Sequence, residues 1–438
     1  MKFLRIAFLC LVASAAAHGQ NRAVVTPNIS GPPVPPVQSH SDGAAATPLA
    51  CLVEEAERNN PEILGAQHGW RAAVNVPQEV SALPETQLFV QQFNVGSPRP
   101  FAGYTNSNFA YVGIGGSQDI PYPGKRALRS SVAEYAASAL HEDAESVRRR
   151  VVETLKLAYY RLAYIQQTLE VLRDNDQLLK EVEQQTESRY GVGQGSQQDV
   201  LKAQLQHSKI LQEITMHHQG EGQFEAQIKQ VLNRPQASSD IVAEPLTLTP
   251  LQHSDAELMQ LAQDQNPELR ARSQMVHHGQ AQVDLAHKEF LPDFNMQYEW
   301  ERTDPAQFRA YYVATFGIRL PNRQRQDAEL AEAKESKVVA EEQMQSEIQR
   351  VLSETKQQCV LVRASEERLK IYREGLIPQS QAAFQAGLTG YGSNREDFES
   401  LLGSFLDVLN LNLQYRQELV EHESALARLE RLTRVALP

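Results

Sequence analysis

Two aspartates carry the clearest chemical signal in the sequence. Asp199 and Asp397 each follow a Gly-rich segment and precede a long stretch without Pro. At the start of a helix, an Asp side chain accepts backbone N–H bonds and complements the helix dipole, so capping alone would explain both residues. The second interpretation is that these carboxylates bind cations. The sequence leaves both interpretations open, and they are compatible.

The other reactive residue types show no catalytic, metal-binding or cofactor-binding pattern. The pairs His217-His218 and His277-His278 are adjacent in sequence, so their side chains point about 100° apart on a helix and do not share a face. We interpret both pairs as solvated helix surface. The three Cys are too few and too scattered for a disulfide framework, and no phosphate-binding loop or nucleophile elbow occurs. An enzyme is therefore the least favoured function class, and no cofactor or metal is predicted.

The composition and the N-terminus indicate an exported, folded protein. The formal net charge is −12, which disfavours nucleic acid as a partner, and 41% of the residues are hydrophobic. Lys2 and Arg5 precede a short apolar run that small residues follow, so residues 1–17 are predicted to be a signal peptide. Neither Cys10 nor Cys51 has the preceding residues of a lipidation site. Residues rich in Pro follow, and 18–48 are predicted to form an extended N-terminal arm.

After the arm, the chain contains an internal repeat. Asn-Pro-Glu-Ile at 60–63 matches Asn-Pro-Glu-Leu at 266–269, and in both segments Asn suits a helix cap and Pro suits the first helical turn. Each half then predicts a helix, two short strands, a very long helix, a Gly-rich turn and a second long helix. We therefore divide the chain into a first repeat, 49–235, a linker, 236–253, and a second repeat, 254–438.

The long helices are the strongest structural signal. Residues 125–190 and 322–374 contain neither Gly nor Pro, and as unbroken helices they would span roughly 100 Å and 80 Å. Apolar residues recur in them with the alternating spacing that is typical of coiled coils. In the second helix this seam includes Cys359, which we interpret as a small packing residue. The seams are narrow and the other faces are charged, a pattern that favours helices around a wide water-filled tube over a solid bundle.

Two segments near residue 300 alternate between apolar and mostly polar residues, which is the period of a strand with two different faces. The apolar positions are Phe294, Met296, Tyr298 and Trp300 in the first segment and Tyr312, Phe316 and Ile318 in the second. Each segment is about as long as a tilted outer-membrane strand requires. Residues 87–95 and 108–118 are weaker counterparts in the first half, and the connectors 96–107 and 302–307 have the composition of turns. A small soluble sheet is the alternative interpretation.

The sequence resembles the outer-membrane efflux channel family, the TolC-like outer membrane factors, over about residues 49–436. The markers are the repeated Asn-Pro-Glu motif, Arg189-Tyr190-Gly191-Val192-Gly193 before Asp199-Val200, Phe384-Gln385-Ala386-Gly387 before Asp397-Phe398, and the strand-to-helix junctions at 120–126 and 320–323. Their order, duplication and spacing around the long helices carry the resemblance.

The resemblance implies a mainly α fold with a small membrane β part, in an outer-membrane homotrimer that extends into the periplasm. Each protomer would give four strands to one shared transmembrane β-barrel, and its long coiled-coil-like helices to a trimeric α-barrel. Four strands cannot close a pore alone, and open sheet edges are not viable in lipid, so pooling of strands agrees with physical expectation. The resemblance also implies a passive exit duct that receives substrates from an inner-membrane pump through a periplasmic adaptor (membrane fusion) protein. Because some members export metal ions, a weak transit site at the His pairs stays an alternative.

The resemblance also implies roles for the two hairpin tips. The residues that would dock the adaptor are Arg189, Tyr190 and Gly193 in the first tip and Phe384 and Gly387 in the second. Asp199 and Asp397 would line the periplasmic gate. The interval from Gly387 to Asp397 exceeds that from Gly193 to Asp199, which predicts a longer second tip. Ser400 stands where the family often has a second acidic residue.

The closest rival function is a secreted coiled-coil scaffold or adhesin without a pore. Such a protein would contain the long helices, but it is not expected to contain strands with one apolar, lipid-facing side. The alternation at 294–301 and 312–320 therefore favours the channel.

Overall fold

The computed structural model describes residues 46–94, 110–303, 309–393 and 395–436. They belong to one compact unit, Ala45–Pro438. The predicted signal peptide, nearly all of the predicted arm, the connector 96–107 and most of the connector 302–307 lie outside the described residues.

The first half of the chain forms short helices, two strands and two long helices. They are α1 (Leu49–Asn59), α2 (Pro61–Ala73), α3 (Val76–Ser81), β1 (Gln87–Phe93), β2 (Tyr111–Ile120), α4 (Lys125–Gly191) and α5 (Gln197–Val231). The second half follows a closely similar order. Its elements are α6 (Asp255–Gln265), α7 (Pro267–Lys288), β3 (Asp293–Thr303), β4 (Arg309–Arg319), α8 (Arg323–Ile371), the π-helix η1 (Tyr372–Leu376), α9 (Ile377–Gly392) and α10 (Phe398–Thr433).

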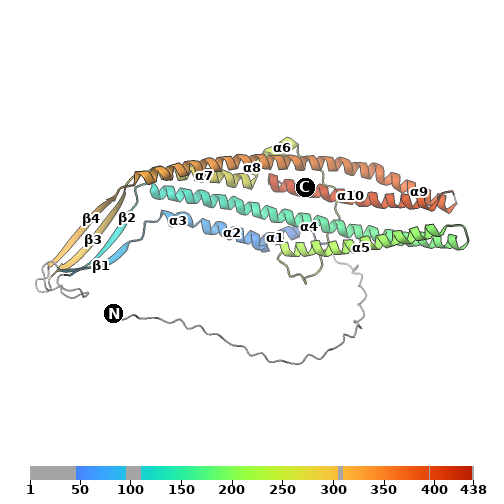
Figure 1. Cartoon of the computed structure of the whole chain (residues 1–438), viewed down its shortest axis with the longest axis horizontal. Coiled ribbons are helices and arrows are strands. Elements are labelled where there is room, and N and C mark those ends of the chain that lie inside the picture. Colours follow the sequence, from blue (N-terminus) through green and yellow to red (C-terminus); the bar gives the residue numbers. More distant parts are fainter. Residues whose placement is uncertain (1–45, 95–109, 304–308, 394, 437–438) are drawn as a thin grey trace, which may run out of the picture. The chain divides into compact units, whose positions relative to one another are not determined.

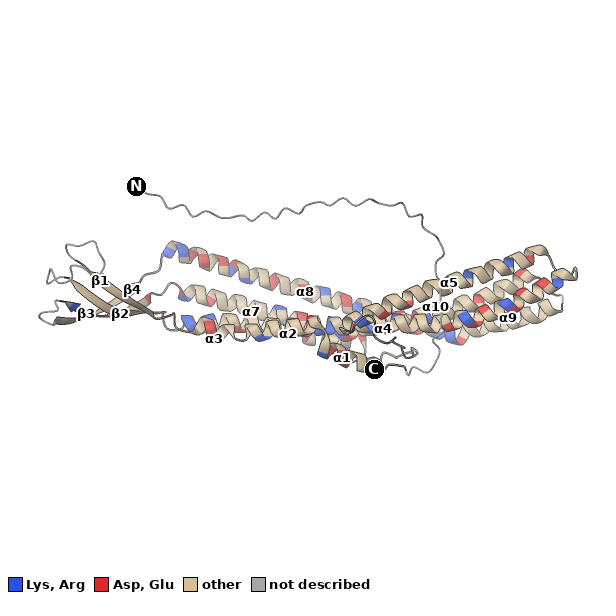
Figure 2. Ribbon diagram, turned by 90° about the horizontal axis from the view of Figure 1, so that it is seen from below, with Lys and Arg blue, Asp and Glu red and all other residues tan. Residues whose placement is uncertain are grey.

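The four strands form one antiparallel sheet in the order β1-β2-β3-β4. Within the described unit, the sheet lies at one end, the turns that join α4 to α5 and α9 to α10 lie at the other, and α4 and α8 run between them (Figure 1). Charged residues of both signs occur along the length of the helices (Figure 2). The mainly α fold with four strands is thus as predicted. Among the described residues, no helix is both long and apolar enough to cross a membrane.

Helix α4 matches the predicted range 125–190, and α8 lies within the predicted range 322–374 and ends at Ile371, where η1 begins. In η1 the N–H of Ile377 bonds to the carbonyl of Tyr372, five residues earlier, and α9 then carries the helical path to Gly392. Pro378 lacks the N–H that an α-helix would use, and the wider π-turn accommodates it. The helical path through α8, η1 and α9 therefore extends beyond the Gly- and Pro-free run 322–374.

The buried seam of α4 is as predicted, and that of α8 differs in part. Every predicted seam position of α4 between Val151 and Leu172 is buried. On α8, Cys359 is buried among apolar side chains, and burial raises the pKa of its thiol, as expected for a packing residue. Leu352 and Glu366 are only partly buried, while their neighbours Val351 and Ser365 are buried instead. Because α8 packs against both α6 and α10, its buried stripe is wider than one coiled-coil seam.

The two Asn-Pro-Glu motifs each join a short helix to the end of a long one. The side-chain oxygens of Asn60 and Asn266 accept bonds from the backbone N–H groups two and three residues later, at 2.9 and 3.2 Å in both halves. Their amide nitrogens donate to the carbonyls of Val231 (2.8 Å) and Leu432 (3.1 Å). Both Asn side chains are buried, so each holds the start of α2 or α7 against the end of α5 or α10.

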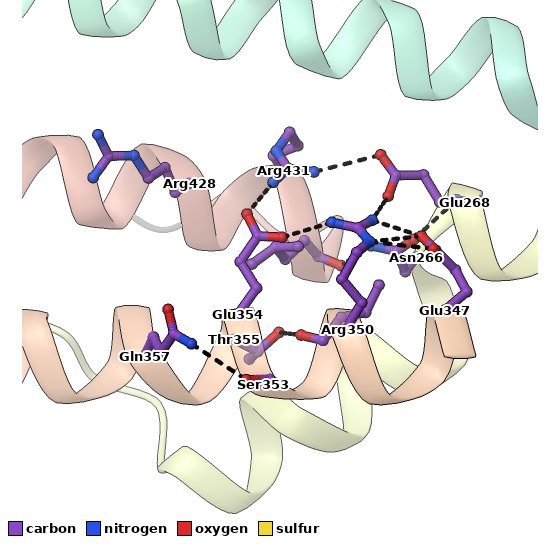
Figure 3. A network of polar contacts seen from close by, with 12 residues as sticks. Asn266, Glu268, Glu347, Arg350, Ser353, Glu354, Thr355, Gln357, Arg428 and Arg431 are labelled. Atoms are coloured by element: carbon purple, nitrogen blue, oxygen red, sulfur yellow. Dashed lines mark hydrogen bonds and ion pairs between the residues drawn. The ribbon is translucent and has the colours of Figure 1, made fainter. Parts of the chain in front are cut away.

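An ion-pair network beside Asn266 joins four helices, and Figure 3 shows its contacts among α7, α8 and α10. Arg431 of α10 places Nε 2.6 Å from Glu153 of α4 and Nη1 3.5 Å from Glu268 of α7. Arg431 also contacts Glu354 of α8, and Arg350 of α8 binds the same two acids, Glu268 and Glu354. Burial raises the pKa of the Glu153 carboxyl, and the Arg431 guanidinium opposes that shift. The network fixes the long helices relative to one another where their apolar seams are narrow.

The linker 236–253 lies across the helices and is fastened by their side chains. Gln166 of α4 accepts a bond from the N–H of Ala243 at 2.9 Å. The hydroxyl of Tyr159 accepts from the N–H of Glu244 and donates to the carbonyl of Thr47, both at 2.8 Å. Thr47 also forms a parallel bridge with Ala243, so the end of the predicted arm is part of the fold.

We predict that Asn266→Ala lowers the free energy of unfolding by about 2–4 kcal/mol, because a helix cap is lost and the buried Leu432 carbonyl loses its donor. Asn266→Ser keeps an oxygen that can cap α7 and loses only the hydrogen bond to the Leu432 carbonyl, so it should lower the free energy of unfolding by less. Asn75→Ala, at an exposed position without a side-chain cap bond, is the matched control and should have little effect. Denaturant unfolding followed by circular dichroism measures the differences. If Asn266→Ala is as stable as the parent, Asn266 does not stabilise the contact between the start of α7 and the end of α10.

Candidate functional site

One face of the sheet is apolar across all four strands. Residues that face each other in the antiparallel register include Met296 with Phe316, Trp300 with Tyr312, and Ile114 with Trp300. The exposed fractions of these side chains are large, from 36% for Trp300 to 69% for Tyr312. Successive aromatic pairs stack, with ring centroids 5.8 Å apart for both Phe294–Phe316 and Tyr298–Tyr312. Helices of the same protomer leave this apolar face uncovered within the described part of the chain.

All seven predicted membrane-facing residues lie on this face. They are Phe294, Met296, Tyr298, Trp300, Tyr312, Phe316 and Ile318. The first half contributes Leu88 and Val90 of β1, exposed at 82% and 65%, which the sequence analysis did not name. Phe89 lies between them, so no local alternation singled them out, and the pairing of Leu88 with Gly116 and of Val90 with Ile114 is what places them on this face. An exposed apolar face of this extent is expected to contact lipid or another protein.

The opposite face is mostly polar. It carries Asn295, Gln297 and Glu299 of β3, which pair with Gly317, Thr315 and Val313 of β4. Since the two faces alternate along every strand, the sheet has one side suited to lipid and one suited to water. β1 and β4 each have a neighbouring strand on only one side among the described residues.

A buried lysine joins the sheet to the helices. Lys125, the first residue of α4, is 1% exposed and places Nζ 2.8 Å from Glu289, 2.9 Å from Asp293 and 2.9 Å from the carbonyl of Leu291. Asp293 also accepts the N–H of Tyr122 at 2.8 Å. This site was not predictable from local patterns, because the acidic partners Glu289 and Asp293 follow Lys125 by 164 and 168 residues. It holds the start of α4 against the start of β3.

At the far end, the two hairpin tips contact each other. Arg189 Nη1 donates to the carbonyl of Tyr391 at 2.7 Å, and the guanidinium lies 4.4 Å from the centre of the Tyr391 ring. Lys202 of α5 pairs with Glu399 of α10 at 2.9 Å. These contacts join the first hairpin to the second within one protomer.

The tip residues predicted from the sequence divide into two groups. Arg189, Tyr190 and Gly193 lie at the end of the first hairpin, where Gly193 has a φ of 75° that favours glycine. Phe384 and Gly387 instead lie inside α9 and are buried against α10, with the Phe384 ring 5.9 Å from that of Phe405. Both are unsuited to contact a partner at the tip surface in this arrangement. The adaptor-docking role of all five residues stays a prediction.

The prediction of a longer second tip is wrong. α4 ends at Gly191 and α5 begins at Gln197, while α9 ends at Gly392 and α10 begins at Phe398. The two connections therefore have the same length. The additional residues after Gly387 extend α9, because Gly390 and Gly392 are accommodated within a helix that packs closely against the Glu396 side chain.

Both predicted gate aspartates cap helices, at different positions. Asp397 is the N-cap of α10, and its Oδ1 accepts the N–H of Ser400 at 2.7 Å. The backbone and hydroxyl of Ser400 lower the pKa of Asp397, which keeps this exposed carboxyl charged. Asp199 lies three residues inside α5, where it exchanges 3.2 Å bonds with Ser196 in a capping box. The Ser-x-x-Asp spacing was the signal for Ser196. The gate role of both aspartates stays a prediction.

The two His pairs have one exposed and one half-buried member each. His217 lies edge-on to the ring of Tyr164, and His277 stacks on Tyr135 with centroids 5.5 Å apart. Burial lowers the pKa of His217 and of His278. Within the described residues, no three His, Cys, Asp or Glu side chains come together as a metal site.

Comparisons with known proteins agree with this arrangement. Residues 258–429 match the family described as outer membrane efflux protein. The outer-membrane channel OprN is 17% identical, with a TM-score of 0.75 over 88% of this chain and 89% of that chain. The outer membrane protein VceC from Vibrio cholerae is 16% identical, with a TM-score of 0.76 over 89% and 97%. The open outer-membrane channel MtrE from Neisseria gonorrhoeae is 15% identical, with a TM-score of 0.74 over 88% of each chain. None of the curated proteins compared matches the sequence.

We predict that Phe316→Arg, in the middle of the apolar face, destabilises the membrane-inserted protein by about 2–4 kcal/mol if the position lies near the bilayer midplane. Thr315→Arg is the matched control on the polar face and should be tolerated. The amount of protein in the outer-membrane fraction and its resistance to extraction by urea measure the difference. Equal behaviour of the two variants would show that the strand is not in lipid or that its register is different.

Proposed function

We propose that this chain, an outer-membrane efflux channel of the TolC type, is the passive exit duct of a tripartite efflux system. The observation that carries the proposal is that the long helices connect two structurally different ends of the molecule. One end is a sheet with a lipid-suited face and a water-suited face, and the other is a pair of helical hairpin tips. A secreted coiled-coil scaffold would have no use for an exposed apolar sheet face, so that alternative is not favoured.

The functional unit would be a homotrimer. The sheet of one protomer has four strands with open edges at β1 and β4, and unpaired backbone groups are costly in lipid. Pairing β4 of one copy with β1 of the next would close the edges without further strands. In the same ring, the helices of three copies would surround a continuous tube below the barrel, with the polar sheet face toward its interior.

The hairpin tips would meet the periplasmic adaptor, and through it an inner-membrane pump. Tyr190 and Val192 are exposed at 48% and 71%, and Arg189 is held at the tip by its contacts with Tyr391. The substrate would pass through the tube without a covalent step, since the duct needs only a pathway and a closure at the tips. Three copies of Asp199 and Asp397 at those tips would bring carboxylates together as two rings that bind cations.

The assembly is tested on the full chain, extracted from the outer-membrane fraction in detergent. We expect a heat-resistant trimer by light scattering that forms ion-conducting channels in planar bilayers. A monodisperse, water-soluble monomer of the mature protein would overturn the proposal, and so would a membrane-inserted trimer without conductance.

The cation rings are tested by substitution with asparagine, which caps a helix about as well as aspartate but carries no charge. Asp397→Asn and Asp199→Asn should both weaken the block of conductance by a divalent cation, and the double variant should weaken it most. Asp264→Asn, an exposed position on α6, serves as the control for loss of charge. If the double variant is blocked like the parent in single-channel recordings, the two residues are helix caps only.

A further inference from the structure

Glu299 is a buried carboxylate without a partner on the polar face of the sheet. Its exposed fraction is 3%, and its Oε1 is shielded from solvent without a hydrogen-bond donor within the described residues. A charged carboxylate oxygen in such a position is costly unless a cation or a proton compensates it. Burial of a Glu in the middle of a strand is also unexpected from its residue type.

The space for this side chain is made by a glycine on the neighbouring strand. A Cβ atom built at Gly113 of β2 would lie 2.5 Å from Glu299 Oε1 and 3.1 Å from Glu301 Cγ. Glu299 and Glu301 are two residues apart on β3 and so lie on the same face. Both side chains therefore lean over the bare backbone of Gly113, which brings two carboxylates together at one place.

A phenol hydroxyl completes this corner of the polar face. Tyr111, two residues before Gly113 on β2, lies on the same face of the sheet as Glu299 and Glu301. Its oxygen accepts a bond from Gln91 Nε2 at 2.8 Å, which fixes the ring from the side of β1. The oxygen atoms that could bind a hard cation are thus the hydroxyl of Tyr111 on β2 and the carboxylates of Glu299 and Glu301 on β3. Gln91 of β1 holds the Tyr111 hydroxyl in place.

In the part of the chain that the structure describes, the two carboxylates lack a basic partner. Within the described residues, neither Glu299 nor Glu301 forms an ion pair with Lys, Arg or His. Asp119, a third carboxylate on the same face, differs in this respect, because it pairs with Arg319 at 3.4 Å and accepts a bond from Asn295 at 2.8 Å. Two adjacent carboxylates that lack a basic partner repel each other, and a divalent cation between them would relieve the repulsion and the desolvation together.

We propose that Glu299 and Glu301 bind a hard divalent cation, such as Ca²⁺ or Mg²⁺, on the polar face of the sheet. The Tyr111 hydroxyl and water would supply further oxygen ligands. With only two carboxylates the site is weak and exchangeable, with a dissociation constant on the order of 10⁻⁴–10⁻³ M. The site is built from one protomer, so it does not depend on the proposed trimer or on conduction. In a trimeric barrel, three such sites would line the lumen toward the strand ends furthest from the helices.

Terbium luminescence tests the site, because Tb³⁺ takes the same oxygen ligands as Ca²⁺ and is sensitised by a nearby tyrosine such as Tyr111. The measurement uses the full chain in detergent with Asp199→Asn and Asp397→Asn, so that the tip carboxylates do not contribute. We expect a saturable signal that Ca²⁺ displaces. Glu299→Gln should raise the half-saturating Tb³⁺ concentration about tenfold, equivalent to about 1.4 kcal/mol.

Two further variants separate binding from a general effect on the sheet. Gly113→Ala keeps both charges, but its Cβ displaces the flexible end of Glu299, so it should weaken Tb³⁺ binding as Glu299→Gln does. Asp119→Asn removes a paired carboxylate from the same face and should leave the titration unchanged. The proposal is overturned if the parent gives no displaceable signal, as expected for a protonated Glu299, or if Glu299→Gln titrates like the parent. A conducting trimer with either result would leave the channel function intact.

Discussion

An apolar sheet face that the protomer leaves uncovered constrains the rest of the described fold. Because side chains alternate along a strand, the apolar residues Met296 and Phe316 on one face require polar ones on the other, and both faces must continue across all four strands. The helices then have to leave the sheet at one end, without folding back over the apolar side. The buried Lys125 contributes to this arrangement by holding the first turn of α4 to the base of β3 through Glu289 and Asp293.

Polar contacts fix the register of the long helices below the sheet. A narrow seam buries few apolar side chains, so helices of this length have little that prevents them from sliding past one another. Asn60 and Asn266 supply fixed points, since each binds both the start of one helix and the last carbonyls of another. Beside Asn266, Arg431 contacts acidic side chains of three other helices and so helps to fix their positions. Exposed ion pairs contribute little, but a partly buried and shared network is more specific in its geometry.

The parts of the fold that follow from local periodicity were predictable, and those that depend on tertiary contacts were not. Alternation at 294–301 and the Gly- and Pro-free run at 125–190 identified strands and helix directly. The second tip was misplaced because Gly387 and Gly390 looked like turn residues, whereas both lie within α9, Gly387 against Ser404 and Leu401 of α10 and Gly390 against Glu396. The position of Glu299 over Gly113 depends on the pairing of β2 with β3, which no local pattern reveals.

The π-turn η1, between α8 and α9, determines which face of α9 is turned toward α10. A π-turn contains one more residue than an α-helical turn. The helix after it therefore has the same rotation about its axis as it would have if that residue were absent and the turn were α-helical. Loss of one residue from Tyr372–Leu376 would therefore leave Phe384 and Tyr391 facing α10. Conversion of the turn to α-helix at constant length would instead rotate α9 by about 100° and turn both aromatic rings away. The π-turn thus sets the rotation of α9 about its axis, and Pro378 favours the setting that is observed.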